Sequence, residues 1–129
     1  MEKVTLKYPE KKPENTIFVS LSVQECVAQV HHELTYGGKL LDQYEITNDG
    51  AKRAIVCVYR HYFIRAGNDL TATVTIDDFT GRTRVHWISG GGSDSAWIDF
   101  DWGAADQLSK LIKERLQPYR QQENEEGCN

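Results

Sequence analysis

Two carboxylates stand two residues apart toward the C-terminal end of the chain. Asp99 and Asp101 fall on one face of an expected strand, which places their Cα atoms about 6.7 Å apart, close to the separation of paired acid and base carboxylates in glycoside hydrolysis. Any two strand residues at this spacing share that geometry, and Arg84 and His86 are expected beside them as cross-strand ion-pair partners. The pair therefore provides one alternative function, a hydrolase that uses Asp99 with His86 or Asp101, and no residue is assigned as catalytic.

Metal ligands need a defined spacing, which the histidines and cysteines of this chain lack. Two histidine ligands are expected at i and i+4 on a helix or at i and i+2 on a strand. Neither spacing occurs among the four histidines, His31, His32, His61 and His86, and the three cysteines, Cys26, Cys57 and Cys128, lie far apart in the sequence. We therefore expect reduced thiols, no metal site and no cofactor.

The glycine run from Gly90 to Gly92 could cradle a phosphate only if it led into a helix and carried Lys with Ser or Thr at fixed offsets. The segment SGGGSDS has no Lys and joins two expected strands. We interpret the run as a strand connection rather than as a nucleotide site.

A further group of residues combines aromatic and basic side chains on the expected inner face of a sheet. Tyr59, His61 and Trp87 share this face, and Arg115 falls by helical angle among the apolar residues of the last helix. An apolar groove with a Tyr, a His and an Arg is typical of a site for a small amphipathic or anionic molecule. The alternative is that these side chains form a packed core, with the Arg reaching its rim.

Charge and hydropathy limit the classes of partner. The chain has 129 residues, with 15 Lys and Arg against 19 Asp and Glu, a net charge of −4, and no basic stretch that could follow a phosphate backbone. No apolar run approaches the roughly 20 residues of a membrane span, and the N-terminus lacks the apolar core of a secretion signal. We therefore expect a cytoplasmic protein that binds neither nucleic acid nor membranes.

The elements that would position these residues begin with a strand over residues 17–21, followed by a helix. Ser22 and Glu25 form a capping box at the start of this helix. Apolar residues then recur at helical spacing, at Val23, Cys26, Val27, Val30 and Leu34. Gly37 and Gly38 end the helix, because glycine adopts the left-handed conformation that follows a helix C-terminus.

From residue 39 the apolar pattern has a period of two, which predicts a meander of antiparallel strands with short turns. A two-residue turn at Thr80-Gly81 sets the register. The expected inner-face pairs are Ile76 with Val85, Val74 with Trp87, Val85 with Phe100 and Trp87 with Ile98. The same register forms two polar rows on the outer face, one of Asp77, Arg84 and Asp101 and one of Thr75, His86 and Asp99.

The register of residues 54–64 stays open because both of their faces are apolar. The two alternatives turn different sets inward: Tyr59, His61 and Phe63 with a two-residue loop at Gly67-Asn68, or Arg60, Tyr62 and Ile64 with a three-residue loop. A tight Asp49-Gly50 loop would place Tyr44 and Ile46 on the inner face, which favours His61 inside.

The last element is a helix that begins near Asp101 and ends before Pro118. Its apolar stripe consists of Ala104, Ala105, Leu108, Leu111, Ile112 and Leu116. Each amphipathic helix has to bury its stripe, and only one sheet face alternates apolar. The sequence therefore predicts an α+β fold of two layers, a curved antiparallel meander packed on one face by an N-terminal and a C-terminal helix, in the order strand, helix, five strands, helix. One domain covers residues 16–119, with residues 1–15 and 120–129 as loosely ordered tails.

This element order resembles that of helix-grip domains and of the related TATA-binding-protein class, in which a sheet wraps a long C-terminal helix. The segment SGGGSDSAWIDFDWGA, residues 89–104, is similar to a pattern of a small bacterial family of unknown function, through Gly90 to Gly92 and the WIDFDWG stretch. The second resemblance covers the C-terminal third of the chain and implies no activity.

Together these observations predict a non-catalytic module that binds a small molecule or a partner. Its site is expected in a groove between the sheet and the C-terminal helix, lined by Tyr59, His61, Trp87 and Arg115. An alternative from a different class is a homodimeric interaction domain, since an apolar outer sheet face would suit a protein interface. The residues expected on that face are Trp97, Ile88, Tyr62 and Ile64.

Overall fold

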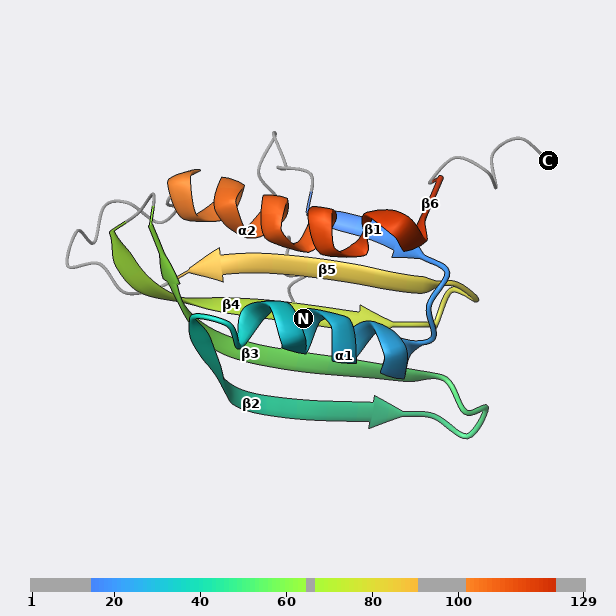
Figure 1. Ribbon diagram of the computed structural model, residues 1–129. Helices are drawn as coiled ribbons and strands as arrows, with labels where there is room; N and C mark the ends of the chain where they lie inside the picture. The colour runs from blue at the N-terminus through green and yellow to red at the C-terminus, as the bar shows by residue number, and fades with distance from the viewer. Residues whose placement is uncertain (1–14, 65–66, 91–101, 123–129) are drawn as a thin grey trace, which may run out of the picture.

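Two helices lie on one face of an antiparallel sheet in the computed structural model, which describes residues 15–64, 67–90 and 102–122 (Figure 1). In chain order the elements are β1 (Thr16–Val19), α1 (Val23–Leu34), β2 (Gly38–Thr47), β3 (Arg53–Phe63), β4 (Asn68–Asp77), β5 (Thr83–Gly90), α2 (Trp102–Leu116), the 3-10 helix η1 (Gln117–Tyr119) and β6 (Arg120–Gln121). Within these ranges the sheet has six strands in the order β2-β3-β4-β5-β1-β6, each antiparallel to its neighbours. The predicted α+β fold, with an antiparallel sheet and two helices, is confirmed.

The capping box predicted at the start of α1 is present. Glu25 N donates to Ser22 Oγ at 3.1 Å, and Ser22 N donates to Glu25 Oε1 at 2.9 Å. The two bonds satisfy N–H groups that have no partner within the helix. Because the Ser22 N–H stabilises the charged carboxylate, it also lowers the pKa of Glu25.

The end of α1 depends on two glycines for different reasons. Gly37 has a φ of +87°, in the left-handed region that favours glycine. At Gly38 a Cβ atom would meet the Leu34 carbonyl oxygen at 2.6 Å, His61 Nδ1 at 2.9 Å and the Arg60 carbonyl oxygen. Only glycine lets the chain pass this point without moving the backbone around it.

α2 packs beside α1 with its predicted stripe turned to the sheet. The buried residues of this stripe are Ala104, Leu108, Ile112 and Leu116. Pro118 follows in η1, where the missing N–H of proline is compatible with the end of the α-helix. The helix therefore stops where the sequence predicted.

The inner face of the sheet has the predicted register between β4 and β5. Ile76 pairs with Val85 and Val74 pairs with Trp87, and all four side chains are buried. The strands separate after the pair of Asp77 with Arg84. Residues 78–83 connect this last pair, which is longer than the two-residue turn predicted but gives the same register.

Of the two registers considered for β3, the structure has the one that turns Tyr59, His61 and Phe63 inward. Tyr59 pairs with Ala72 and His61 with Leu70, in the same buried rows as the core of β4. Phe63 pairs with Asn68, so residues 64–67 connect the two strands. This connection holds an even number of residues, as a two-residue loop does, and therefore turns the same residues inward.

The pairs expected between Val85 and Phe100 and between Trp87 and Ile98 are replaced by another strand. The second edge of β5 is occupied by β1, in which Ile17 pairs with Val85 and Thr16 with His86. β1 in turn pairs with β6 on its other side. Residues 91–101, which include Phe100, Ile98, Asp99 and Asp101, lie outside the described residues.

The expectation that Tyr44 and Ile46 face the core is wrong. Tyr44 pairs with Val56 and Ile46 with Ala54, which places both on the outer face. The cause is the loop of residues 48–52, which is longer than the tight turn expected. Asn48 Oδ1 accepts hydrogen bonds from Gly50 N and Lys52 N, and Ala51 has a φ of +65°. The changed loop length shifts the register by one residue and reverses both faces of this part of β2.

Candidate functional site

Tyr59 and His61 point from β3 toward α1. Tyr59 is fully buried, with its Oη 3.0 Å from His31 Nδ1 and the two rings in an edge contact. His61 is 6% exposed, and its Nδ1 lies 3.3 Å from the Leu34 carbonyl oxygen. A carbonyl oxygen can only accept, so Nδ1 of His61 carries a proton and donates it to the last turn of α1. Both side chains hold the helix against the sheet.

Trp87 and Arg115 make contacts with other elements. The indole Nε1 of Trp87 donates to Ser109 Oγ at 2.8 Å and connects β5 to α2. Arg115 Nε donates to Gln29 Oε1 at 2.8 Å, and its Nη1 lies 3.8 Å from Glu33 Oε1. Arg115 is about one third exposed and links the two helices at the surface rather than lining the sheet.

The structure therefore brings together only part of the predicted ligand set. Tyr59 and His61 share the space under α1, Trp87 contacts α2, and Arg115 lies between the helices. Each of the four is already bonded to a neighbouring element. A small molecule in the expected groove would have to displace those contacts.

The thiols on the inner face, Cys26 and Cys57, are expected to be unreactive. Burial raises the pKa of Cys26 to about 12 and also raises the pKa of Cys57. The pKa of the Tyr59 hydroxyl is raised as well, mainly by burial. A thiol has to ionise to act as a nucleophile, so neither cysteine is activated for covalent catalysis.

The opposite face of the sheet has no helix over it among the described residues, since α1 and α2 both lie on the inner side (Figure 1). We define the outer-sheet patch as six apolar side chains of β2, β3 and β5: Tyr44, Ile46, Val56, Val58, Tyr62 and Ile88. Tyr44, Ile46, Val56 and Val58 adjoin one another, because Val56 pairs with Tyr44 and the other two follow at alternate positions of the same strands. Ile88 shares the row of Val58 beyond Thr73, and Tyr62 lies beyond the row of Arg60. The patch is thus an apolar cluster on β2 and β3, with Ile88 and Tyr62 at its margins.

Four of the six side chains of the outer-sheet patch are exposed, and Val56 and Val58 are partly buried. Tyr44 is 61% exposed, Ile88 50% and Tyr62 48%. Ile64, two residues after Tyr62, is 76% exposed. Contiguous apolar surface of this kind marks sites of protein interaction more often than single exposed residues do.

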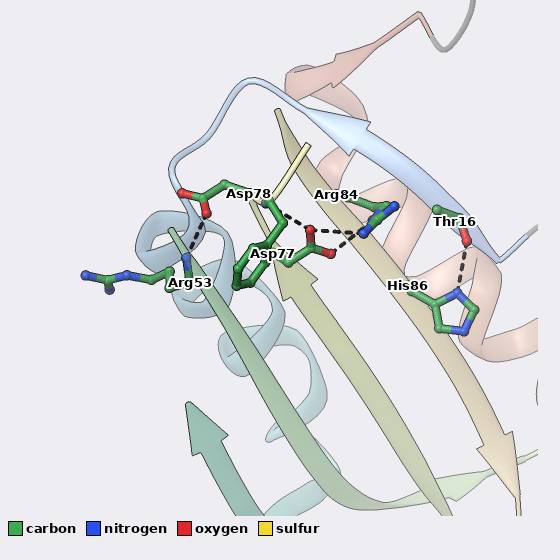
Figure 2. Close-up of polar contacts among 7 residues, drawn as sticks. Thr16, Arg53, Asp77, Asp78, Arg84 and His86 are labelled. Carbon is green, nitrogen blue, oxygen red and sulfur yellow. Dashed lines mark hydrogen bonds and ion pairs between the residues drawn. The ribbon is translucent and has the colours of Figure 1, made fainter. Parts of the chain in front are cut away.

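One end of the outer face is polar, and Figure 2 shows its contacts. Arg84 donates two hydrogen bonds to Asp77, as expected from their pairing. Beside them His86 Nδ1 lies 2.9 Å from Thr16 Oγ1. The predicted rows of Asp77 with Arg84 and of Thr75 with His86 are confirmed. Thr16 and Phe18 of β1 continue these rows where Asp99 and Asp101 were expected.

The hydrolase alternative gains no support from the described residues. Asp99 and Asp101 fall outside them, as does Trp97, and the contact seen for His86 is with the hydroxyl of Thr16. Across the described ranges no three His, Cys, Asp or Glu side chains are grouped as a metal ion would require. No helix in the same ranges combines the length and apolar character needed to cross a membrane.

The sequence prediction placed Ile88 and Tyr62 correctly on the outer face and missed Tyr44 and Ile46, while Ile64 is exposed in the turn after β3. Val56 and Val58 were not assigned either. A signal was present, because the run Ala54-Ile55-Val56-Cys57-Val58 is apolar at every position. When a strand is apolar on both faces and only one face lies in the core, its other apolar face is exposed or covered by a partner.

The comparisons with known proteins point to one family. The family of unknown function DUF6054 matches residues 14–120. No curated protein and no solved structure matches the chain. The likeness to helix-grip folds stays a prediction, and most of the segment 89–104 lies outside the described residues.

Proposed function

Since the chain belongs to the DUF6054 family, whose function is unknown, we propose from its own structure that it is a non-catalytic protein-interaction module that binds a protein through the outer-sheet patch. The observation that carries the proposal is the cluster of exposed apolar side chains on the sheet face opposite the helices. The two helices already complete the inner core, so the outer apolar residues contribute nothing to it.

The composition of the outer-sheet patch supports a protein partner rather than a small molecule. Tyrosines and β-branched residues on a rigid sheet provide large contact areas at a low cost in side-chain entropy. The patch consists of apolar side chains on one sheet face, whereas small-molecule sites are concave with a few placed polar atoms. The groove lined by Tyr59, His61, Trp87 and Arg115 is less favoured because its polar atoms are bonded within the protein.

The experiment is site-specific photo-crosslinking in the host cell. Benzoylphenylalanine replaces Ile88 in the outer-sheet patch or, in the matched control, Ala28 on the exposed side of α1. We expect a discrete crosslinked protein from position 88 and none from position 28. The captured protein is identified, purified and titrated against the wild-type chain and the Ile88→Glu variant.

A partner that binds wild type and loses affinity at least about tenfold for Ile88→Glu would support the proposal. Crosslinks of equal yield at positions 28 and 88 would contradict it, and so would a captured protein that binds both chains equally. Absence of any crosslink at position 88 would also contradict it.

A further inference from the structure

We infer that the protein bound by the outer-sheet patch is a second copy of this chain, packed sheet against sheet about a two-fold axis. This inference rests on the proposed function and names its partner. It follows from the area of the outer face, from its charge and from the properties of the exposed sheet edge.

The outer face is large enough for a stable dimer. It spans β2, β3, β4, β5 and β1, and β3 alone has 11 residues. With strands about 4.8 Å apart and a rise of about 3.3 Å per residue, the face measures on the order of 600 Å². Two copies would bury on the order of 1,200 Å², at the lower end of the range for specific interfaces.

The charge of the outer face allows two identical copies to approach. The charged side chains that β2 to β5 place on this face are three acidic and three basic: Asp42, Asp69, Asp77, Lys39, Arg60 and Arg84. This face is therefore neutral in a chain whose net charge is −4. The balance of charge on this face allows two identical copies to meet there without net charge repulsion.

The middle of the outer face can be approached closely. Its central rows hold Val56, Val58, Thr73 and Thr75, which are short and β-branched. Sheets with such side chains pack about 10 Å apart with their strands nearly aligned. The longer Tyr44 and Ile88 stand on either side of this centre, on β2 and β5. A two-fold axis through the centre would bring each of them against the partner copy.

The free edge of β2 is a poorer route to a dimer. β2 has a register shift between Leu40 and Asp42, which interrupts the ladder of free backbone groups. Lys39, Asp42 and Glu45 lie along the same strand. Bulges and charges of this kind discourage strand addition at a sheet edge.

The test is sedimentation equilibrium of the purified full chain at micromolar concentrations. We expect wild type to sediment at twice the monomer mass of 14.7 kDa. Ile88→Glu and Tyr44→Glu each place a negative charge on the outer face, and we expect each to raise the dimer dissociation constant at least about tenfold. Ala28→Glu adds the same charge on the exposed side of α1 and should leave the dimer intact. Circular dichroism is the check that each variant keeps its fold, and the two outer-face variants provide independent tests.

A wild-type chain that stays monomeric across this range would overturn the inference. The proposed function would then stand or fall separately on whether position 88 crosslinks a different protein in the cell. A dimer that survives both outer-face substitutions would also overturn the inference, because another surface would then be responsible.

Discussion

Arg84 donates two hydrogen bonds to Asp77 across the β4–β5 pair, from Nε to Oδ2 at 3.0 Å and from Nη2 to Oδ1 at 3.1 Å (Figure 2). Asp77 is only 5% exposed, and its Oδ1 also accepts a hydrogen bond from Phe79 N at 3.1 Å. One carboxylate thus joins the end of the strand pair to the turn that follows it.

Asp77→Ala should lower the free energy of unfolding by about 2 kcal/mol, because Arg84 and the Phe79 N–H both lose a nearly buried partner. The cost is below that of a fully buried pair, since the Arg84 side chain is 38% exposed. Urea denaturation followed by circular dichroism measures the change. Asp49→Ala, at an exposed loop position, is the control and should stay within about 0.5 kcal/mol of wild type. Equal stability of the two variants would show that the Asp77 contacts add nothing.

Gly38→Ala should destabilise the protein by about 2 kcal/mol or more, because the new Cβ meets two backbone carbonyl oxygens and His61 Nδ1. Backbone atoms cannot move aside as a flexible side chain can. Gly50→Ala is the matched control, since its Cβ would make an ordinary contact at 3.6 Å with Asn48 Oδ1. The melting temperatures of the two variants are compared by calorimetry. Equal melting temperatures of the Gly38→Ala and Gly50→Ala variants would refute the close packing at the end of α1.

Cys26 and Cys57 should resist thiol reagents in the folded protein. Burial raises the pKa of Cys26 to about 12, so only about one thiol in ten thousand is ionised at pH 8. The raised pKa of Cys57 acts in the same direction, and both reactivities should increase as the pH rises. The measurement uses a Cys128→Ser variant and Ellman's reagent, with the same protein in denaturing urea as the control. Rapid reaction of either thiol at pH 8 without urea would contradict the buried positions.

Local signals in the sequence predicted the elements whose contacts are also local. The capping box of Ser22 with Glu25 and the pairing of Ile76 with Val85 join residues three and nine positions apart. These contacts do not depend on distant segments of the chain. The spacing of the residues and the type of turn between them are therefore enough to predict them. For the same reason Ile88 could be placed on the outer face from its alternation with Trp87.

The faces of β2 depended on one residue in a loop. A tight turn at Asp49-Gly50 would have turned Tyr44 inward, and the observed loop of residues 48–52 turns it outward. Asn48 accepts two backbone hydrogen bonds in this loop, and Ala51 adopts a left-handed conformation that only the folded surroundings stabilise. The sequence therefore predicted only two of the six residues of the outer-sheet patch, Tyr62 and Ile88.

Composition and periodicity by themselves determined the class of this protein: two amphipathic helices, alternating strands, and more apolar surface than one inner face can hold. Tertiary structure alone decided that Ile17 rather than Phe100 pairs with Val85, and that Tyr44 and Ile46 face outward. A strand edge can bond to any other edge of suitable length, because backbone hydrogen bonds carry no sequence information. The choice between distant segments is made by which arrangement buries both helices on one core, and that is a property of the whole chain.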